Sequence, residues 1–351
     1  MTSLTRTAYL TKQVLIFGVI IVGILIGLRI FWGLGKQIWR SISPPPTPAP
    51  SVSFGQLPPL DFSGGSFATS SAKISYEIET IEGKLPQLPT QAKVFKVSQP
   101  PASILSGEKA KQKAARLGFS PILQQFSDRI YVFQDAEIYG RTLTIDIVTG
   151  SFSITSDLYQ FPEILSLAGQ LRPQDAIGQA KNFLRDNIAT TSDFPDAKIQ
   201  TKLLKLEDRD LKDAKSVGET QLIRVDFYRQ DLEKLPILPL EKDKANIWVL
   251  VSPLKESKKQ IVGVNFTYWP VDIKTWATYP LKTSQEAFDE LKIGKGIVIS
   301  TKGPIATVRK VYLSYLETKN LPMFFQPVFV FDGDDGFRAL VPAVQGAWIK
   351  G

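Results

Sequence analysis

The feature that most constrains this chain is an uninterrupted apolar run near its N-terminus. Residues 14–28 read VLIFGVIIVGILIGL, and the apolar character continues past Arg29 to Gly35. A helix over 14–35 would be about 33 Å long at about 1.5 Å per residue, which is enough to cross a bilayer. A cleaved signal peptide is the alternative, but Arg29-Ile-Phe-Trp32 stands where a small-residue cleavage site would fall. We therefore expect a retained single-pass transmembrane helix over 14–35, preceded by a short N-terminal tail over 1–13.

The orientation of this helix is set only weakly by charge, because basic residues flank it almost equally on both sides. A short tail before a long C-terminal domain is the layout of a signal anchor, so we expect the large domain on the extracytoplasmic side of the cell membrane. Gly23 and Gly27 are four residues apart, a spacing that lets a second helix approach closely. The pair predicts a homodimer through the anchor helix or contact with another membrane helix, although one such pair also arises by chance.

A proline-rich segment follows the apolar run. Residues 44–59 read PPPTPAPSVSFGQLPP and carry no charge. Prolines at this density exclude a helix or a central strand and favour extended polyproline structure, at about 3 Å per residue. A ligand of an SH3-type domain is the alternative, but no basic residue beyond Arg40 adjoins the prolines. We expect a semi-rigid linker over 36–71.

From residue 72 onward, the chain repeats a short capped helix followed by alternating strands. One helix is predicted to begin near Ser106, a second has Pro173 in its first turn, and Thr283 with Glu286 forms the capping box of a third. These signals divide the chain into three α+β units, over 72–165, 166–280 and 281–351. The predicted fold class is α+β, with tandem units of a short helix packed on antiparallel sheet.

The composition excludes large parts of catalytic chemistry. The chain has no His and no Cys, so triads with His, His or Cys zinc sites, haem ligation by His or Cys and disulfides are impossible.

The net charge of +8 falls to +3 beyond residue 50, which does not indicate nucleic-acid binding. The turn Asp332-Gly-Asp334-Asp335-Gly lacks the terminal Glu of a calcium-binding loop and is typical of a hairpin. We predict no catalytic residues, no cofactor and no metal site.

Aromatic side chains are the candidate partner-binding residues, because aromatic residues dominate binding hot spots. Their positions are Tyr268, Trp269, Trp276, Tyr279, Phe324 and Phe325. The alternative is packing in the core between a strand over 259–269 and the third helix. The sequence leaves both interpretations open.

The recurring unit of helix and hairpin, with strands such as Leu143-Thr-Ile-Asp-Ile-Val-Thr-Gly150, resembles a PepSY-type module. The C-terminal part resembles the extracytoplasmic YycH/YycI regulatory proteins. The matching stretches are Tyr279-Pro-Leu, Thr283-Ser-Gln-Glu-Ala287, Val311-Tyr-Leu-Ser-Tyr315, Gln326-Pro-Val-Phe-Val-Phe331 and Val341-Pro-Ala343. This resemblance covers roughly residues 100–345, and it implies a protein that contacts a sensor histidine kinase in the membrane and is not an enzyme.

Together these features predict a membrane-anchored, extracytoplasmic regulatory or adaptor module that acts by protein–protein contact. The expected partners are the membrane and another envelope or membrane protein, and no nucleic acid. An envelope structural or cell-wall-binding protein that uses the aromatic surface is the alternative. A hydrolase that relies on carboxylates alone is the third reading.

Overall fold

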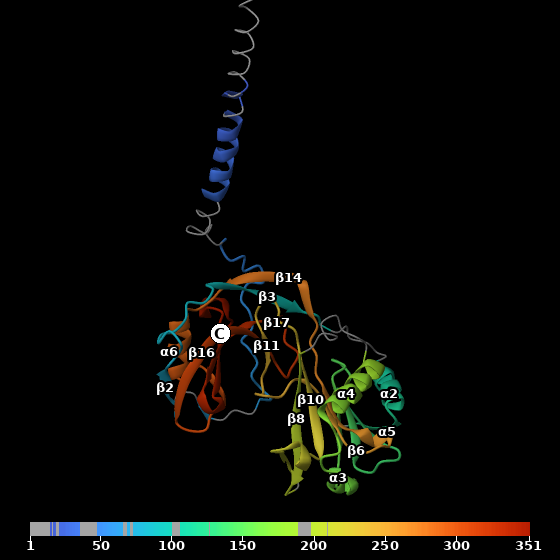
Figure 1. Ribbon diagram of the computed structural model, residues 1–351. Helices are drawn as coiled ribbons and strands as arrows, with labels where there is room; N and C mark the ends of the chain where they lie inside the picture. The colour runs from blue at the N-terminus through green and yellow to red at the C-terminus, as the bar shows by residue number, and fades with distance from the viewer. Residues whose placement is uncertain are drawn as a thin grey trace, which may run out of the picture. The chain divides into compact units, whose positions relative to one another are not determined.

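The computed structural model describes residues 15, 17–18, 21–35, 48–65, 69–70, 73–99, 106–125, 127–188, 198–208 and 210–351. The chain divides into two compact units, Met1–Ala49 and Pro50–Gly351. In the first, the described residues 15, 17–18 and 21–35 are helical, and the second contains three β-sheets with short helices (Figure 1).

The structure corrects the prediction of a transmembrane helix over 14–35. Over the described residues, no helix has the length and apolar character to cross a membrane. Residues 14, 16, 19 and 20 of the predicted span lie outside the described residues.

The largest sheet has nine antiparallel strands and is built from two similar halves. In each half a helix precedes four strands, and β9 adds to the edge of the second half. The first half comprises α2 (Ser106–Arg116), β4 (Phe119–Gln125), β5 (Ile130–Asp135), β6 (Arg141–Asp146) and β7 (Phe152–Ser156). The second comprises α4 (Pro173–Asn187), β8 (Lys198–Glu207), β9 (Asp210–Asp213), β10 (Leu222–Tyr228), β12 (Ile247–Val251) and β13 (Ile261–Phe266).

The two halves join along their last strands. β7 pairs with β13, with Ile154 opposite Val264 and Phe152 opposite Phe266. The first two predicted α+β units thus share one continuous sheet, which runs from β4 to β9, and are not separate sheets. Pairing these strands removes two sheet edges whose backbone groups would otherwise lack partners.

Helices α2 and α4 cover the same face of the nine-stranded sheet (Figure 1). Small residues let both helices approach the strands closely: Ala110 and Ala114 of α2 and Ala176 and Ala180 of α4 are buried. Other apolar side chains of the same sheet form a second, smaller cluster. It contains Leu204, Leu222, Leu250 and Val262 together with residues of the loops around η2 (Leu158–Gln160), α3 (Glu163–Ser166) and α5 (Ser257–Gln260).

The second sheet has seven strands around the long strand β16. In order, they are β1 (Thr69–Ser70), β15 (Ile297–Ser300), β19 (Arg338–Pro342), β18 (Pro327–Gly333), β16 (Ile305–Glu317) and β11 (Ile237–Pro239), while β2 (Ser75–Ile78) also pairs with β16. Helix α6 (Ser284–Lys292) packs Ala287, Phe288 and Leu291 into the core of this sheet. Its capping box of Thr283 and Glu286 is confirmed. The predicted hairpin turn is also confirmed, since residues 334–336 form η4 between β18 and β19.

The third sheet is small and has the order β14 (Val271–Pro280), β3 (Gln91–Val97) and β17 (Phe324–Phe325). Part of the predicted linker packs beside it. We call residues 50–62 the N-terminal strap. Leu57 of the strap is 0% exposed, its amide N donates to the carbonyl O of Trp348 at 2.8 Å, and its carbonyl O accepts from the amide N of Lys350 at 2.8 Å. Over residues 50–62 the predicted linker is therefore an integral part of the folded domain and not a free spacer.

Candidate functional site

Three of the predicted partner-binding aromatics lie in the core. Trp269, Tyr279 and Phe325 are at most 3% exposed. Trp269 Nε1 donates to the carbonyl O of Thr318 at 2.8 Å, and the Tyr279 hydroxyl donates to the carbonyl O of Gly55 at 2.8 Å. These contacts hold the elements together, so the three side chains are out of reach of a partner.

The other three aromatics do not form one surface. Trp276 is 43% exposed, and Lys93 Nζ lies 4.3 Å from its ring centroid. Tyr268 is half-buried beneath the Arg229 guanidinium. Phe324 stacks on Phe54 of the N-terminal strap, with ring centroids 4.9 Å apart. The structure thus leaves only Trp276 of the predicted set largely open to solvent.

The predicted helix-packing glycines lie in the helix over 21–35. A Cβ atom added at Gly23 or Gly27 would meet nothing within 4 Å. Their contact with a second helix stays a prediction.

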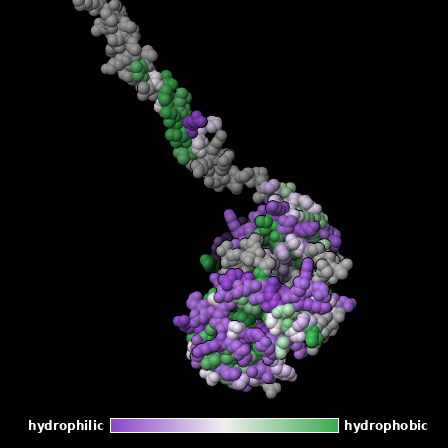
Figure 2. Space-filling view, turned by 90° about the vertical axis from the view of Figure 1, so that its right-hand side faces the viewer, coloured by the Kyte–Doolittle hydropathy of each residue, from purple (hydrophilic) through white to green (hydrophobic). Residues whose placement is uncertain are grey.

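Figure 2 shows one face of the Pro50–Gly351 unit, on which hydrophilic residues predominate and hydrophobic ones form small patches. A binding site on such a surface has to combine polar and apolar groups. Three recesses among the described residues do so, and they differ in how their charges are neutralised.

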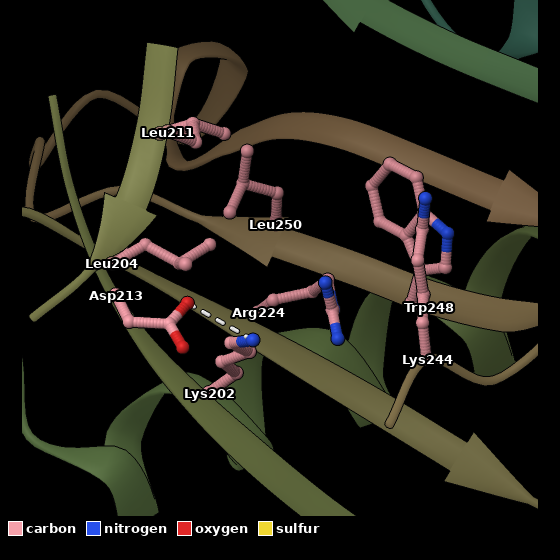
Figure 3. Close-up of a pocket in the computed structure, with 8 residues that line it drawn as sticks. All are labelled: Lys202, Leu204, Leu211, Asp213, Arg224, Lys244, Trp248 and Leu250. Carbon is pink, nitrogen blue, oxygen red and sulfur yellow. Dashed lines mark ion pairs between the residues drawn. The ribbon is translucent and has the colours of Figure 1, made fainter. Parts of the chain in front are cut away.

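The first recess lies on strands β8, β9, β10 and β12, and its volume is about 260 Å³ (Figure 3). It is lined by Lys202, Leu204, Leu211, Asp213, Arg224, Lys244, Trp248 and Leu250. Leucines and the Trp248 ring form its apolar part, and three cations project beside them.

Each of these cations already has an anionic partner. Lys202 Nζ lies 2.9 Å from Asp213 Oδ1, and Lys244 Nζ lies 3.2 Å from Glu241 Oε2. Arg224 Nε donates to Asp226 Oδ2 at 2.8 Å. The first recess therefore offers little uncompensated charge to a ligand.

Asp226 beside this recess has the chemistry of a general acid but not the access. Burial raises the pKa of its carboxyl, against the opposing effect of Arg224. Raised carboxyl pKa values are common at catalytic sites. However, Asp226 is 2% exposed, and its oxygens accept from Arg224 and from the amide N of Ala245. Its role is structural.

The second recess is an acidic one beside α6, lined by Lys282, Glu286, Asp289, Glu290, Ile293, Gln345 and Gly346. Its carboxylates also have hydrogen-bond or ion-pair partners already. Glu286 caps α6, Glu290 pairs with Lys282 at 2.6 Å, and Asp289 pairs with Lys292 at 2.6 Å. No group of three or more acidic side chains among the described residues is arranged to hold a metal ion.

The third recess is a groove of about 480 Å³ between the start of β8 and the strands β11 and β16. We call it the lysine groove. Its lining residues are Leu88, Pro89, Lys198, Lys234, Leu235, Pro236, Leu238, Lys310, Tyr312 and Leu313. Most of them are apolar, and the three lysines are exposed.

The charges of the lysine groove are not neutralised within the described part of the chain. No described carboxylate forms an ion pair with Lys198, Lys234 or Lys310. The neighbouring acid Glu233 is held by Lys93 at 2.7 Å. Lys310 Nζ lies 4.8 Å from the centroid of the Tyr312 ring. The groove therefore combines an apolar floor with three available cations.

Sequence reasoning missed the lysine groove. Its lysines lie 36 and 76 positions apart along the chain, in segments that carry no shared motif. The single local signal is Leu235-Pro-Ile-Leu-Pro239, where two prolines flank a short strand that ends at a sheet edge.

Comparisons with known proteins leave the family open. No protein-family model matches the chain, and no curated protein matches it. An uncharacterized protein from Eubacterium rectale is similar at 12% identity, over 77% of this chain and 88% of that chain, with a TM-score of 0.35. The YpeB C-terminal domain of Bacillus megaterium is similar at 12% identity, over 71% of this chain and 96% of that one, with a TM-score of 0.27. These values indicate a distant likeness from which no function is transferred, and the YycH/YycI resemblance stays a prediction.

Proposed function

We propose that this protein is a binding module that holds an acidic segment of another protein in the lysine groove. The observation that carries the proposal is the pairing of an apolar floor with three exposed lysines that have no described anionic partner. Like charges gathered without counter-charges raise the local potential and attract a segment of opposite sign. The apolar floor supplies the burial that makes such a contact more than a surface ion pair.

The proposal concerns binding and includes no chemical step. The other two recesses support this choice, because their ionisable groups already form ion pairs with neighbouring side chains. The predicted contact with another protein is retained, but it moves from the aromatic residues to the lysine groove. An extracytoplasmic location, an envelope or membrane protein as the partner, and a homodimer through the N-terminal helix remain predictions from the sequence.

Site-specific photocrosslinking in cells tests the proposal. A photoreactive residue replaces Leu238 in the full chain, and crosslinked partner peptides are identified by mass spectrometry. We expect crosslinks to an acidic segment of one protein, and we expect them to disappear in the triple variant Lys198→Glu, Lys234→Glu, Lys310→Glu. The matched control is Lys109→Glu, Lys181→Glu, Lys274→Glu, which changes the same total charge at exposed positions elsewhere.

Two results would contradict the proposal. One is a crosslinking pattern that both triple variants reduce equally, which would indicate a general charge effect. The other is a set of crosslinked peptides without an acidic segment in common.

A further inference from the structure

Strand β16 is incompletely paired on one side. On its other side it pairs with β18 along most of its length. On the open side, β2 runs parallel to Ile305–Val308 and β11 runs parallel to Tyr315–Glu317. Between them, no described strand pairs with residues 309–314 on this side. We call this stretch the β16 gap.

The backbone of Val311 and Leu313 faces the gap. The amide N of Tyr315 donates toward the open side, to the carbonyl O of Pro236 at 2.9 Å, whereas the amide N of Leu316 donates to Gln326 on the β18 side. Backbone groups of successive residues alternate between the two sides of a strand. The N–H and C=O groups of Val311 and Leu313 therefore point to the same side as those of Tyr315.

Both neighbouring strands stop where they would have to bond these groups. The carbonyl O of Val308 accepts the amide N of Glu79, and β2 ends at Ile78. A register shift between Val308 and Lys310 lies immediately after this bond. At the other end, the next donor of the parallel ladder would be Pro236, which has no N–H to give to Leu313.

The described residues therefore leave the backbone N–H and C=O groups of Val311 and Leu313 without hydrogen-bond partners. Val311 is nevertheless only 6% exposed and Leu313 only 3% exposed. Backbone groups in buried positions are nearly always paired, and an unpaired one costs free energy. An edge of this kind is a template for an added strand.

The β16 gap and the lysine groove are the same place, because Lys310, Tyr312 and Leu313 line the groove. We infer that the acidic segment binds as an extended strand that hydrogen-bonds to Val311 and Leu313. This inference rests on the proposed function and adds the conformation of the bound segment. The gap of residues 309–314 is about 20 Å long at about 3.3 Å per residue, so it holds a segment of about four residues once its ends are allowed for.

The side chains of such a segment alternate between two faces. One face meets the apolar floor of the groove, and the other meets its lysines. The partner segment should therefore alternate acidic and apolar residues, and a protein partner of this pattern is the occupant we propose.

Amide exchange in the full chain tests the open edge directly. In the free protein, NMR should show faster hydrogen exchange at Val311 and Leu313 than at Tyr312 and Ser314, whose amides face β18. Saturation with acetyl-Glu-Val-Glu-Val-Glu-amide should slow exchange at Val311 and Leu313 by at least tenfold. Equal protection of all four amides in the free protein would overturn the inference.

Backbone-methylated forms of the same peptide separate strand pairing from charge attraction. One form is N-methylated at residues 2 and 4, and the other at residues 1, 3 and 5. We expect one form to bind at least tenfold more weakly than the parent peptide and the other to bind within threefold of it, because only one set of amides faces β16.

The outcomes distinguish the inference from the proposed function. If both methylated forms bind like the parent while the groove triple variant binds none of them, the strand pairing is wrong and the groove proposal stands. If the groove triple variant binds the parent peptide normally, the groove proposal is wrong as well. Failure of the parent peptide to bind at about 1 mM, or equally tight binding of inorganic phosphate alone, would also overturn the inference.

Discussion

At the residue scale, the buried Arg141 and the half-buried Lys113 are stabilised in different ways. Arg141 lies 2.6 Å from Asp135, and their side chains are 6% and 3% exposed. No described carboxylate pairs with Lys113, whose Nζ lies 3.8 Å from the centroid of the Phe152 ring. The loss of water is therefore compensated at Arg141 by an ion pair and at Lys113, among the described contacts, by an aromatic face.

Replacing Arg141 with Ala should destabilise the protein by about 3–5 kcal/mol, because Asp135 would be left as a buried carboxylate without its partner. Arg129→Ala is the control, since Arg129 is 54% exposed in its pair with Asp146 and should cost about 1 kcal/mol or less. Urea unfolding at pH 7 measures both. Similar losses for the two variants would contradict this account of the buried pair.

Lys113 makes the free energy of unfolding depend on pH in a predictable direction. Burial, with a smaller effect of Arg116, lowers the pKa of Lys113 from 10.5 to about 8. The unfolded chain binds this proton more tightly than the folded one, so stability should rise as the pH increases from about 8 to about 10.5. Lys113→Met should abolish this rise and increase the free energy of unfolding at pH 7 by about 1–3 kcal/mol.

The control for this prediction is Lys109→Met, because Lys109 is exposed on the same helix. Its unfolding free energy should keep the rise with pH seen in the unchanged protein. A rise that persists in Lys113→Met would show that other groups cause it.

At the element scale, local signals predicted helices well and long-range pairing poorly. The helix beginning at Ser106, Pro173 in the first turn of α4 and the capping box of α6 are confirmed. Caps and apolar periodicity act within a few residues, so the sequence records them directly. The pairing of β7 with β13 and the packing of the N-terminal strap depend on residues more than a hundred positions apart.

The same limit applies to the candidate site. The aromatic residues were visible as a set, but their burial depends on which strands neighbour them, and half of them are core residues. The lysine groove could not be predicted, because its three lysines become neighbours only when β8, β11 and β16 are in place.

The N-terminal strap provides a test at this scale. Leu57→Ala should destabilise the protein by about 2–4 kcal/mol, because Leu57 is fully buried against the core of the seven-stranded sheet. Gln56→Ala, at an exposed neighbouring position, should change stability by about 0.5 kcal/mol or less. A loss below about 1 kcal/mol for Leu57→Ala would mean that the segment behaves as a free linker.

At the scale of the whole Pro50–Gly351 unit, a buried polar network connects the nine-stranded and seven-stranded sheets. Arg229 lies 3.5 Å from Glu317, and both side chains are 7% exposed. Asn246 Nδ2 donates to the carbonyl O of Glu317 at 3.3 Å, and Trp269 Nε1 donates to that of Thr318. These bonds couple the two sheets that border the lysine groove.

We predict that this unit unfolds in one cooperative transition, with tryptophan fluorescence and far-UV circular dichroism changing together in urea. Trp269→Phe should lower the free energy of unfolding by about 1–3 kcal/mol, because the buried carbonyl O of Thr318 would lose a donor. Trp276→Phe is the exposed control. Two separate transitions in the unchanged protein would contradict the coupling.

The central claim, that the lysine groove binds an acidic segment, is tested most directly by one affinity measurement. Fluorescence anisotropy with labelled acetyl-Glu-Val-Glu-Val-Glu-amide compares the full chain with the two triple charge-reversal variants. We predict at least tenfold weaker binding for Lys198→Glu, Lys234→Glu, Lys310→Glu, and a change within threefold for Lys109→Glu, Lys181→Glu, Lys274→Glu. Equal losses in the two variants would contradict the claim, because the groove would then contribute no more than the net charge of the protein.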